Sequence, residues 1–115
     1  MKLAKSIIDL LENENINVSN PTKQNNQYYC EIEFESNAGE DVIETVWYDG
    51  TKKSFIDNFD TLALEFDPDE HAELWVNSRG KNGVPESIRE LINDADDIKN
   101  TLMDLASKLN NLIYH

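Results

Sequence analysis

Carboxylate side chains alternate with apolar ones along one segment of this 115-residue chain. Glu31, Glu33 and Glu35 are each separated by one residue, so a strand would carry all three on one face, about 6.6 Å apart. Glu44, on the next predicted strand, is expected to stand across from them. The set is either a solvated strand face or a contact surface that presents carboxylates to basic residues as a phosphate backbone would. The candidate partner-binding residues are Tyr29, Glu31, Glu33, Glu35, Glu44 and Tyr48.

Other clusters do not match a catalytic or metal-binding pattern. His71 lies one helical turn from Asp67, without a third histidine or cysteine nearby to complete a zinc site. Asp94, Asp96 and Asp97 lack the glycine and the closing glutamate of a calcium loop, so we expect them on a solvated helix face. Among 23 acidic side chains, any pair is uninformative as an acid–base pair. We therefore predict a protein that is not an enzyme and that holds no metal or cofactor.

Cys30 is the only cysteine, which excludes an intramolecular disulfide and a cysteine-based zinc site. It falls on the inward face of its predicted strand, which favours packing over nucleophilic chemistry. The apolar runs are short and predict neither a transmembrane helix nor a secretory signal. We expect a cytoplasmic protein, folded as a single domain over residues 1–115 and present as a monomer or homodimer.

The net charge points to a class of partner. There are 23 acidic and 10 basic side chains, which gives −13, and residues 31–50 hold seven acids and no base. Such a field repels nucleic acid and anionic lipid, so we predict no direct binding to nucleic acid or membrane. A basic nucleic-acid-binding protein is the expected partner.

Periodicity predicts an α+β fold, with a small antiparallel sheet of two or three strands packed on one face by about four helices. The sheet is a hairpin of strands 28–36 and 42–48, with residues 16–18 as the candidate third strand. In the second strand we expect the core to receive Ile43, Thr45 and Trp47. Val42, Glu44, Val46 and Tyr48 would then face outward.

The predicted helices cover residues 3–13, 52–66 and 85–111, with a short one after Pro68 that ends by Arg79–Gly80. Thr51 and Asp67 have the side chains of helix N-caps, and Pro68 suits the first turn. The last helix would be about 40 Å long. In a compact domain it must kink near residues 93–94 or project at one end.

Three segments carry a resemblance that covers roughly residues 40–110. Val46–Thr51, Phe66–Ala72 and Gly83–Pro85 resemble a group of small acidic proteins from phages and integrative elements of low-GC Gram-positive bacteria. In size, acidity and element order the chain also looks like DNA-mimicking anti-CRISPR and anti-restriction proteins. The resemblance implies an inhibitor that occupies a basic groove of a host defence protein, such as a CRISPR effector or a restriction enzyme. The alternative is an accessory protein, acidic for solubility, that binds its partner through the helical face around Trp75 or through the 80–85 loop.

Overall fold

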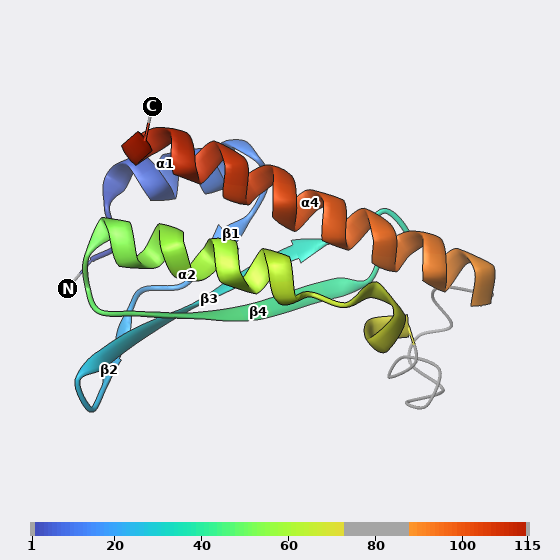
Figure 1. Ribbon diagram of the computed structural model, residues 1–115, viewed down its shortest axis with the longest axis horizontal. Coiled ribbons are helices and arrows are strands. Elements are labelled where there is room, and N and C mark those ends of the chain that lie inside the picture. Colours follow the sequence, from blue (N-terminus) through green and yellow to red (C-terminus); the bar gives the residue numbers. More distant parts are fainter. Residues whose placement is uncertain (1, 73–87, 115) are drawn as a thin grey trace.

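The computed structural model describes residues 2–72 and 88–114, and it confirms the predicted α+β class. Four strands form one antiparallel sheet, and the helices lie on one side of it (Figure 1). A short helix begins at Pro68, and the predicted ends of the 68–80 helix and the 80–85 loop fall outside the described residues. The other elements are α1 (Lys5–Asn13), β1 (Asn17–Val18), β2 (Thr22–Gln24), β3 (Gln27–Glu35), β4 (Asp41–Tyr48), α2 (Lys52–Glu65) and α4 (Ile88–Tyr114).

Strand β3 is the centre of the sheet. It pairs with β4 along one edge and with β1 and β2, one after the other, along the opposite edge. The expected third strand is therefore present as β1. Strand β2, by contrast, lies in a segment that we predicted to be loop. It is joined to β3 through Asn25, which takes a positive φ of 58°, a conformation that asparagine tolerates well and that permits a tight hairpin here.

The register of β3 and β4 overturns the predicted orientation of β4. Cys30 stands opposite Val46 and Phe34 opposite Val42, so the even-numbered residues of both strands share the core face. Val42, Val46 and Tyr48 are buried, whereas Trp47 is 41% exposed and Ile43 is 53% exposed. The prediction that Ile43, Thr45 and Trp47 face the core is wrong.

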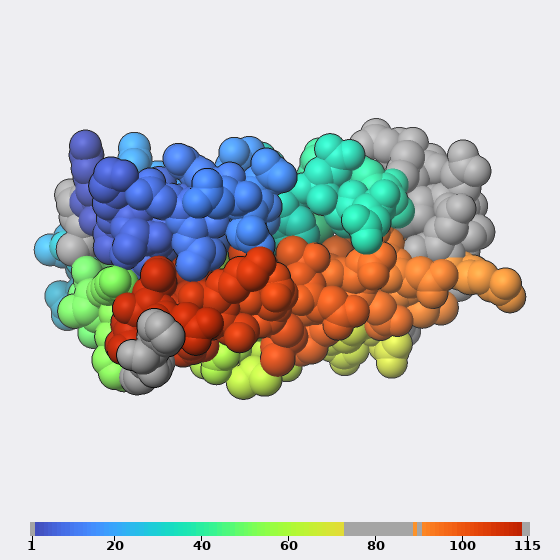
Figure 2. Space-filling model, turned by 90° about the horizontal axis from the view of Figure 1, so that it is seen from above, coloured from blue at the N-terminus to red at the C-terminus, as the bar shows by residue number. Residues whose placement is uncertain are grey.

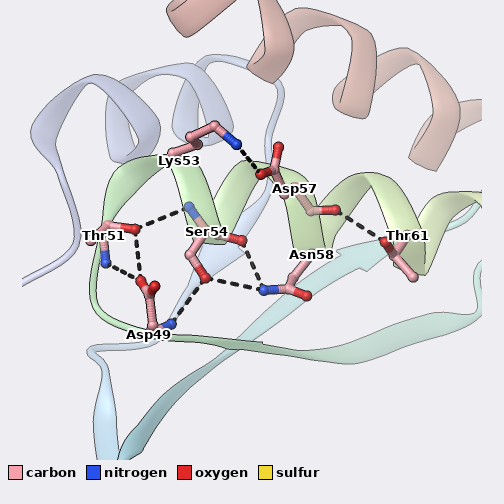
Figure 3. A network of polar contacts seen from close by, with 7 residues as sticks. All are labelled: Asp49, Thr51, Lys53, Ser54, Asp57, Asn58 and Thr61. Carbon is pink, nitrogen blue, oxygen red and sulfur yellow. Dashed lines mark hydrogen bonds and ion pairs between the residues drawn. The ribbon is translucent and has the colours of Figure 1, made fainter.

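The turn into α2 is closed by side-chain caps (Figure 3). Thr51 Oγ1 accepts a hydrogen bond from the Ser54 N–H, which confirms Thr51 as the N-cap. Asp49 accepts from Thr51 through Oδ1, and the Asp49 N–H donates to Ser54 Oγ. These bonds satisfy the free amides at the helix start and end β4 at a fixed point. The caps at Asp67 are present too, because its Oδ1 accepts from the N–H groups of Asp69 and Glu70.

Helix α4 spans the molecule. Its 27 residues form one unbroken helix through positions 93–94, where a kink was one of the two predicted alternatives. At about 1.5 Å per residue the helix is about 40 Å long, close to the largest dimension of the structure, 41 Å. It lies alongside α1 and the β3–β4 turn on the helical side (Figure 2). The expected conflict between the length of this helix and the size of a compact domain does not arise, because the structure is elongated.

The core fills the space between the sheet and the helices. Phe55, Phe59 and Ile56 of α2 are fully buried, and the Tyr48 ring packs edge-on against Phe55 with centroids 5.3 Å apart. Cys30 is buried as expected, and its Sγ lies 3.9 Å from Tyr48 Oη. None of the helices in the described ranges is long and apolar enough to cross a membrane.

Candidate functional site

The side of the sheet turned away from the helices, here called the outer face, carries most of the predicted site. Glu31, Glu33 and Glu35 are exposed there, as predicted. Glu35 stands opposite Asp41 in the register, so Asp41 supplies the fourth carboxylate of this face. The outer face consists of Tyr29, Glu31, Glu33, Glu35, Asp41, Ile43, Thr45 and Trp47.

Two predicted site residues do not belong to the outer face. Glu44 stands opposite Ile32 and Tyr48 opposite Tyr28, so both lie on the core face. Tyr48 is 3% exposed. Glu44 is half-buried, and burial raises the pKa of its carboxyl. The predicted placement of Glu44 and Tyr48 beside the other glutamates is wrong.

The outer-face carboxylates have no compensating charge. Within the described chain, Glu31, Glu33, Glu35 and Asp41 make no side-chain hydrogen bond or ion pair. The strands that form this face, β3 and β4, contain no lysine or arginine. Like charges on one sheet face cost a few tenths of a kcal/mol for each close pair. The sheet therefore carries a small electrostatic penalty that folding alone does not require.

An aromatic pair that the sequence interpretation missed lies at one end of the outer face. The rings of Tyr29 and Trp47 are opposite each other with centroids 4.8 Å apart. Ile43 lies farther along β4, more than half exposed, opposite Glu33. Exposed aromatic side chains are enriched at protein interfaces, where they bury much area at a low entropic cost. The outer face thus combines an apolar end with an acidic end.

A second polar cluster joins the β3–β4 turn to α4 and to the helix at Pro68. Asp94, expected in solvent, is 2% exposed; its carboxylate accepts from Ser36 Oγ at 2.5 Å and from the Ala38 N–H at 2.9 Å. Glu40 Oε1 lies 3.0 Å from His71 Nε2. Glu40 Oε2 is buried and meets no donor in the described part of the chain. It can hydrogen-bond to Asp94 only if one of the two carboxyl groups keeps a proton.

The electrostatics assign that proton to Glu40. Burial and the neighbouring Asp94 raise the pKa of Glu40 to about 8. Burial would raise the pKa of Asp94 as well, but hydrogen bonds from Glu40, Ser36 and Ala38 lower it below the ordinary value. Burial lowers the pKa of His71, with Asp94 acting in the opposite direction. At neutral pH, then, a neutral His71 donates to Glu40, and the protonated Glu40 donates to Asp94.

This cluster ties three segments together, and we assign it a structural role. Within residues 2–72 and 88–114, no group of three or more histidine, cysteine, aspartate or glutamate side chains is arranged to hold a metal ion. Searches against protein-family models, curated proteins and solved structures find no match to this chain. The geometry of the outer face is therefore the main guide to function.

Proposed function

We propose that this protein is a non-enzymatic binding protein whose outer face docks onto a basic groove of a nucleic-acid-binding protein. The observation that carries the proposal is a set of four carboxylates, Glu31, Glu33, Glu35 and Asp41, that meet no cation among residues 2–72 and 88–114. A basic groove would neutralise them and remove their mutual repulsion. The finer form of the proposal is a mobile-element inhibitor that excludes nucleic acid from a CRISPR effector or a restriction enzyme.

A comparison with the charge density of DNA supports a part for the aromatic pair beside the carboxylates. Along β3 there is one carboxylate per about 6.6 Å, whereas one strand of duplex DNA carries a phosphate per about 3.4 Å of axis. The face therefore presents about half the linear charge of one DNA strand. Tyr29 and Trp47 are well placed to supply the remaining affinity, since they lie on the same face and keep exposed ring surface.

A displacement assay tests the proposal. Fluorescent duplex DNA is bound to a restriction endonuclease and, separately, to a CRISPR effector nuclease, and the protein is added at low and at high salt. We expect it to displace the DNA from one of them, with an affinity that falls as salt rises. The triple variant Glu31→Lys, Glu33→Lys, Glu35→Lys should lose about tenfold or more in affinity, which is about 1.4 kcal/mol or more.

The matched control changes the same charge on another surface. Glu12→Lys, Asp96→Lys and Asp104→Lys replace exposed acids of α1 and α4, and both triples move the net charge from −13 to −7. The control triple should displace DNA nearly as well as the parent. Equal losses in the two triples would mean that only total charge matters. Undiminished displacement by the outer-face triple would favour the alternative of a helical binding surface.

A further inference from the structure

One edge of the sheet is left open among the described residues. β4 pairs with β3, and no described strand pairs with its other edge. The N–H of Glu31 donates to Ser19 Oγ, and its C=O accepts from the Ser19 N–H. Both backbone groups of Glu31 therefore point away from β4, so Thr45, its partner in the register, points its own N–H and C=O toward the open edge. By the alternation of a strand, the same holds for Ile43 and Trp47.

This edge lacks most of the features that protect exposed strands from pairing. Natural edges are blunted by proline, by lysine, by bulges or by an inward-pointing charge. β4 is eight residues long and contains no proline, lysine or arginine, and its register with β3 is regular. Only Glu44 points a charge inward. An unprotected edge of this length has the geometry needed to accept one more strand.

A pocket lies directly beside Glu44 on the core side of this edge. Its volume is about 270 Å³, and its walls include Glu44, Leu62, Glu65, Phe66 and Glu70. Among the described residues, its walls come from β4, the end of α2 and the segment 66–71, and none comes from β3 or α4, which places the pocket beside β4 on the side away from β3. Glu44 makes no hydrogen bond or ion pair with a described residue. Leu62 and Phe66 can pack against the aliphatic stem of a lysine or arginine, and the three glutamates can meet its charge.

We infer that β4 accepts an extended basic segment of the partner as a fifth strand, with one lysine or arginine side chain of that segment in the pocket at Glu44. This inference rests on the proposed function, for which it names the form of the partner's contact. A second copy of the chain is a poor occupant, because each copy carries −13 and the hairpin alone carries −7 over residues 31–50. A basic segment supplies both the backbone hydrogen bonds and the opposite charge.

The test uses a short capped peptide of alternating arginine and valine, long enough to span β4. A peptide of the same sequence with methylated backbone nitrogens at its centre keeps the charge but cannot complete the ladder. We expect the parent peptide to bind and to slow amide hydrogen exchange at Ile43, Thr45 and Trp47. The methylated peptide should bind about tenfold or more weakly.

Two test variants of the protein, each with a matched control variant, give the reciprocal evidence. Thr45→Pro removes an N–H that points to the open edge, a position where proline is tolerated, so the fold should persist while the parent peptide binds about tenfold more weakly. Thr45→Val keeps the N–H and should bind normally. Glu44→Gln with Glu65→Gln should also weaken binding, while the charge-matched Glu12→Gln with Asp96→Asn should not.

Each remaining outcome overturns the inference. Equal binding of both peptides, or binding without amide protection at β4, would mean attraction by charge alone; the proposed function would stand, since it rests on the outer face and not on the edge of β4. Failure of the parent peptide to bind would reject strand addition, and the displacement assay would then decide the proposed function independently. A dimer in sedimentation that Thr45→Pro dissociates would assign the edge to a second copy of the chain.

Discussion

Replacing Phe59 by alanine is expected to remove about 3–5 kcal/mol from the free energy of unfolding. The ring is fully buried between the sheet and the helices, with its centroid 6.3 Å from that of Phe55. The loss would be a large share of the total, because domains of this kind have only about 5–15 kcal/mol. Trp47→Ala should cost about 1 kcal/mol or less, because that side chain keeps 41% of its surface in solvent. Chemical denaturation of both variants gives the comparison.

The contrast between the two variants tests the orientation of β4. Leu64→Ala, at a residue of α2 that is 59% exposed, is the control for loss of an exposed side chain and should behave like Trp47→Ala. If Trp47→Ala destabilised the protein as strongly as Phe59→Ala, the outward position of Trp47 would be contradicted. A loss with Phe59→Ala no greater than with Leu64→Ala would contradict the core.

The fold class and most elements follow from local pattern. Alternation over residues 28–48 and helical spacing elsewhere were sufficient for the hairpin, α1, α2 and α4, and capping residues marked the starts of α2 and the helix at Pro68. Strand β2 could not be predicted from hydrophobic periodicity, because its three residues are all polar and exposed and therefore form no apolar face. Only the neighbouring β3 and a turn at Asn25 specify it.

The predicted orientation of β4 was wrong for a physical reason that bears on the site. Its odd residues include Trp47 and Ile43, while its even residues include Glu44, and the prediction placed the odd set in the core and the even set outside. The hairpin register decides otherwise, because Glu35 pairs with Asp41 and places even residues opposite even ones. Glu44 is accommodated because it sits beside a pocket at the sheet's open edge and not in the centre of the core.

The cluster at Asp94 shows a different limit of sequence interpretation. Ser36, Glu40, His71 and Asp94 come from three segments that are far apart in the chain. No spacing rule links them, and Asp94 shares its stretch of the chain with Asn93, Asp96 and Asp97, polar residues typical of a solvated helix face. Asp94 meets Ser36 and Ala38 only in the folded chain, where α4 lies against the β3–β4 turn.

This cluster makes stability depend on pH: the free energy of unfolding is expected to fall by about 2 kcal/mol between pH of about 6.5 and about 8.5. The pKa of Glu40 is raised from an ordinary 4.5 to about 8, so the folded protein holds this proton more tightly than the unfolded chain does. Such a group contributes its full stability below the unfolded pKa, and the contribution is lost as pH rises through the folded pKa. Thermal unfolding at several pH values should show a fall of about 8 °C.

Between pH of about 6.5 and about 8.5, the titration of Glu40 dominates the change in the free energy of unfolding. The pKa of His71 is lowered by burial, so it destabilises the folded state only below its ordinary value of 6.5, and there it opposes the effect of Glu40. Burial raises the pKa of Cys30, and that group lowers stability mainly at the upper limit of the window and above. Asp94 titrates far below it, since its pKa is lowered.

The isosteric variant Glu40→Gln isolates the responsible proton. Its amide can donate to Asp94 and its carbonyl can accept from His71, as the protonated glutamate does, but it cannot ionise. We expect it to match the parent near pH 6.5 and to be about 2 kcal/mol more stable near pH 8.5. Glu35→Gln removes the same charge from an exposed carboxylate nearby and should keep the full decline. If Glu40→Gln declined as steeply as the parent, Glu40 would be ionised at neutral pH, and Asp94 would face a second buried negative charge that the fold tolerates by other means.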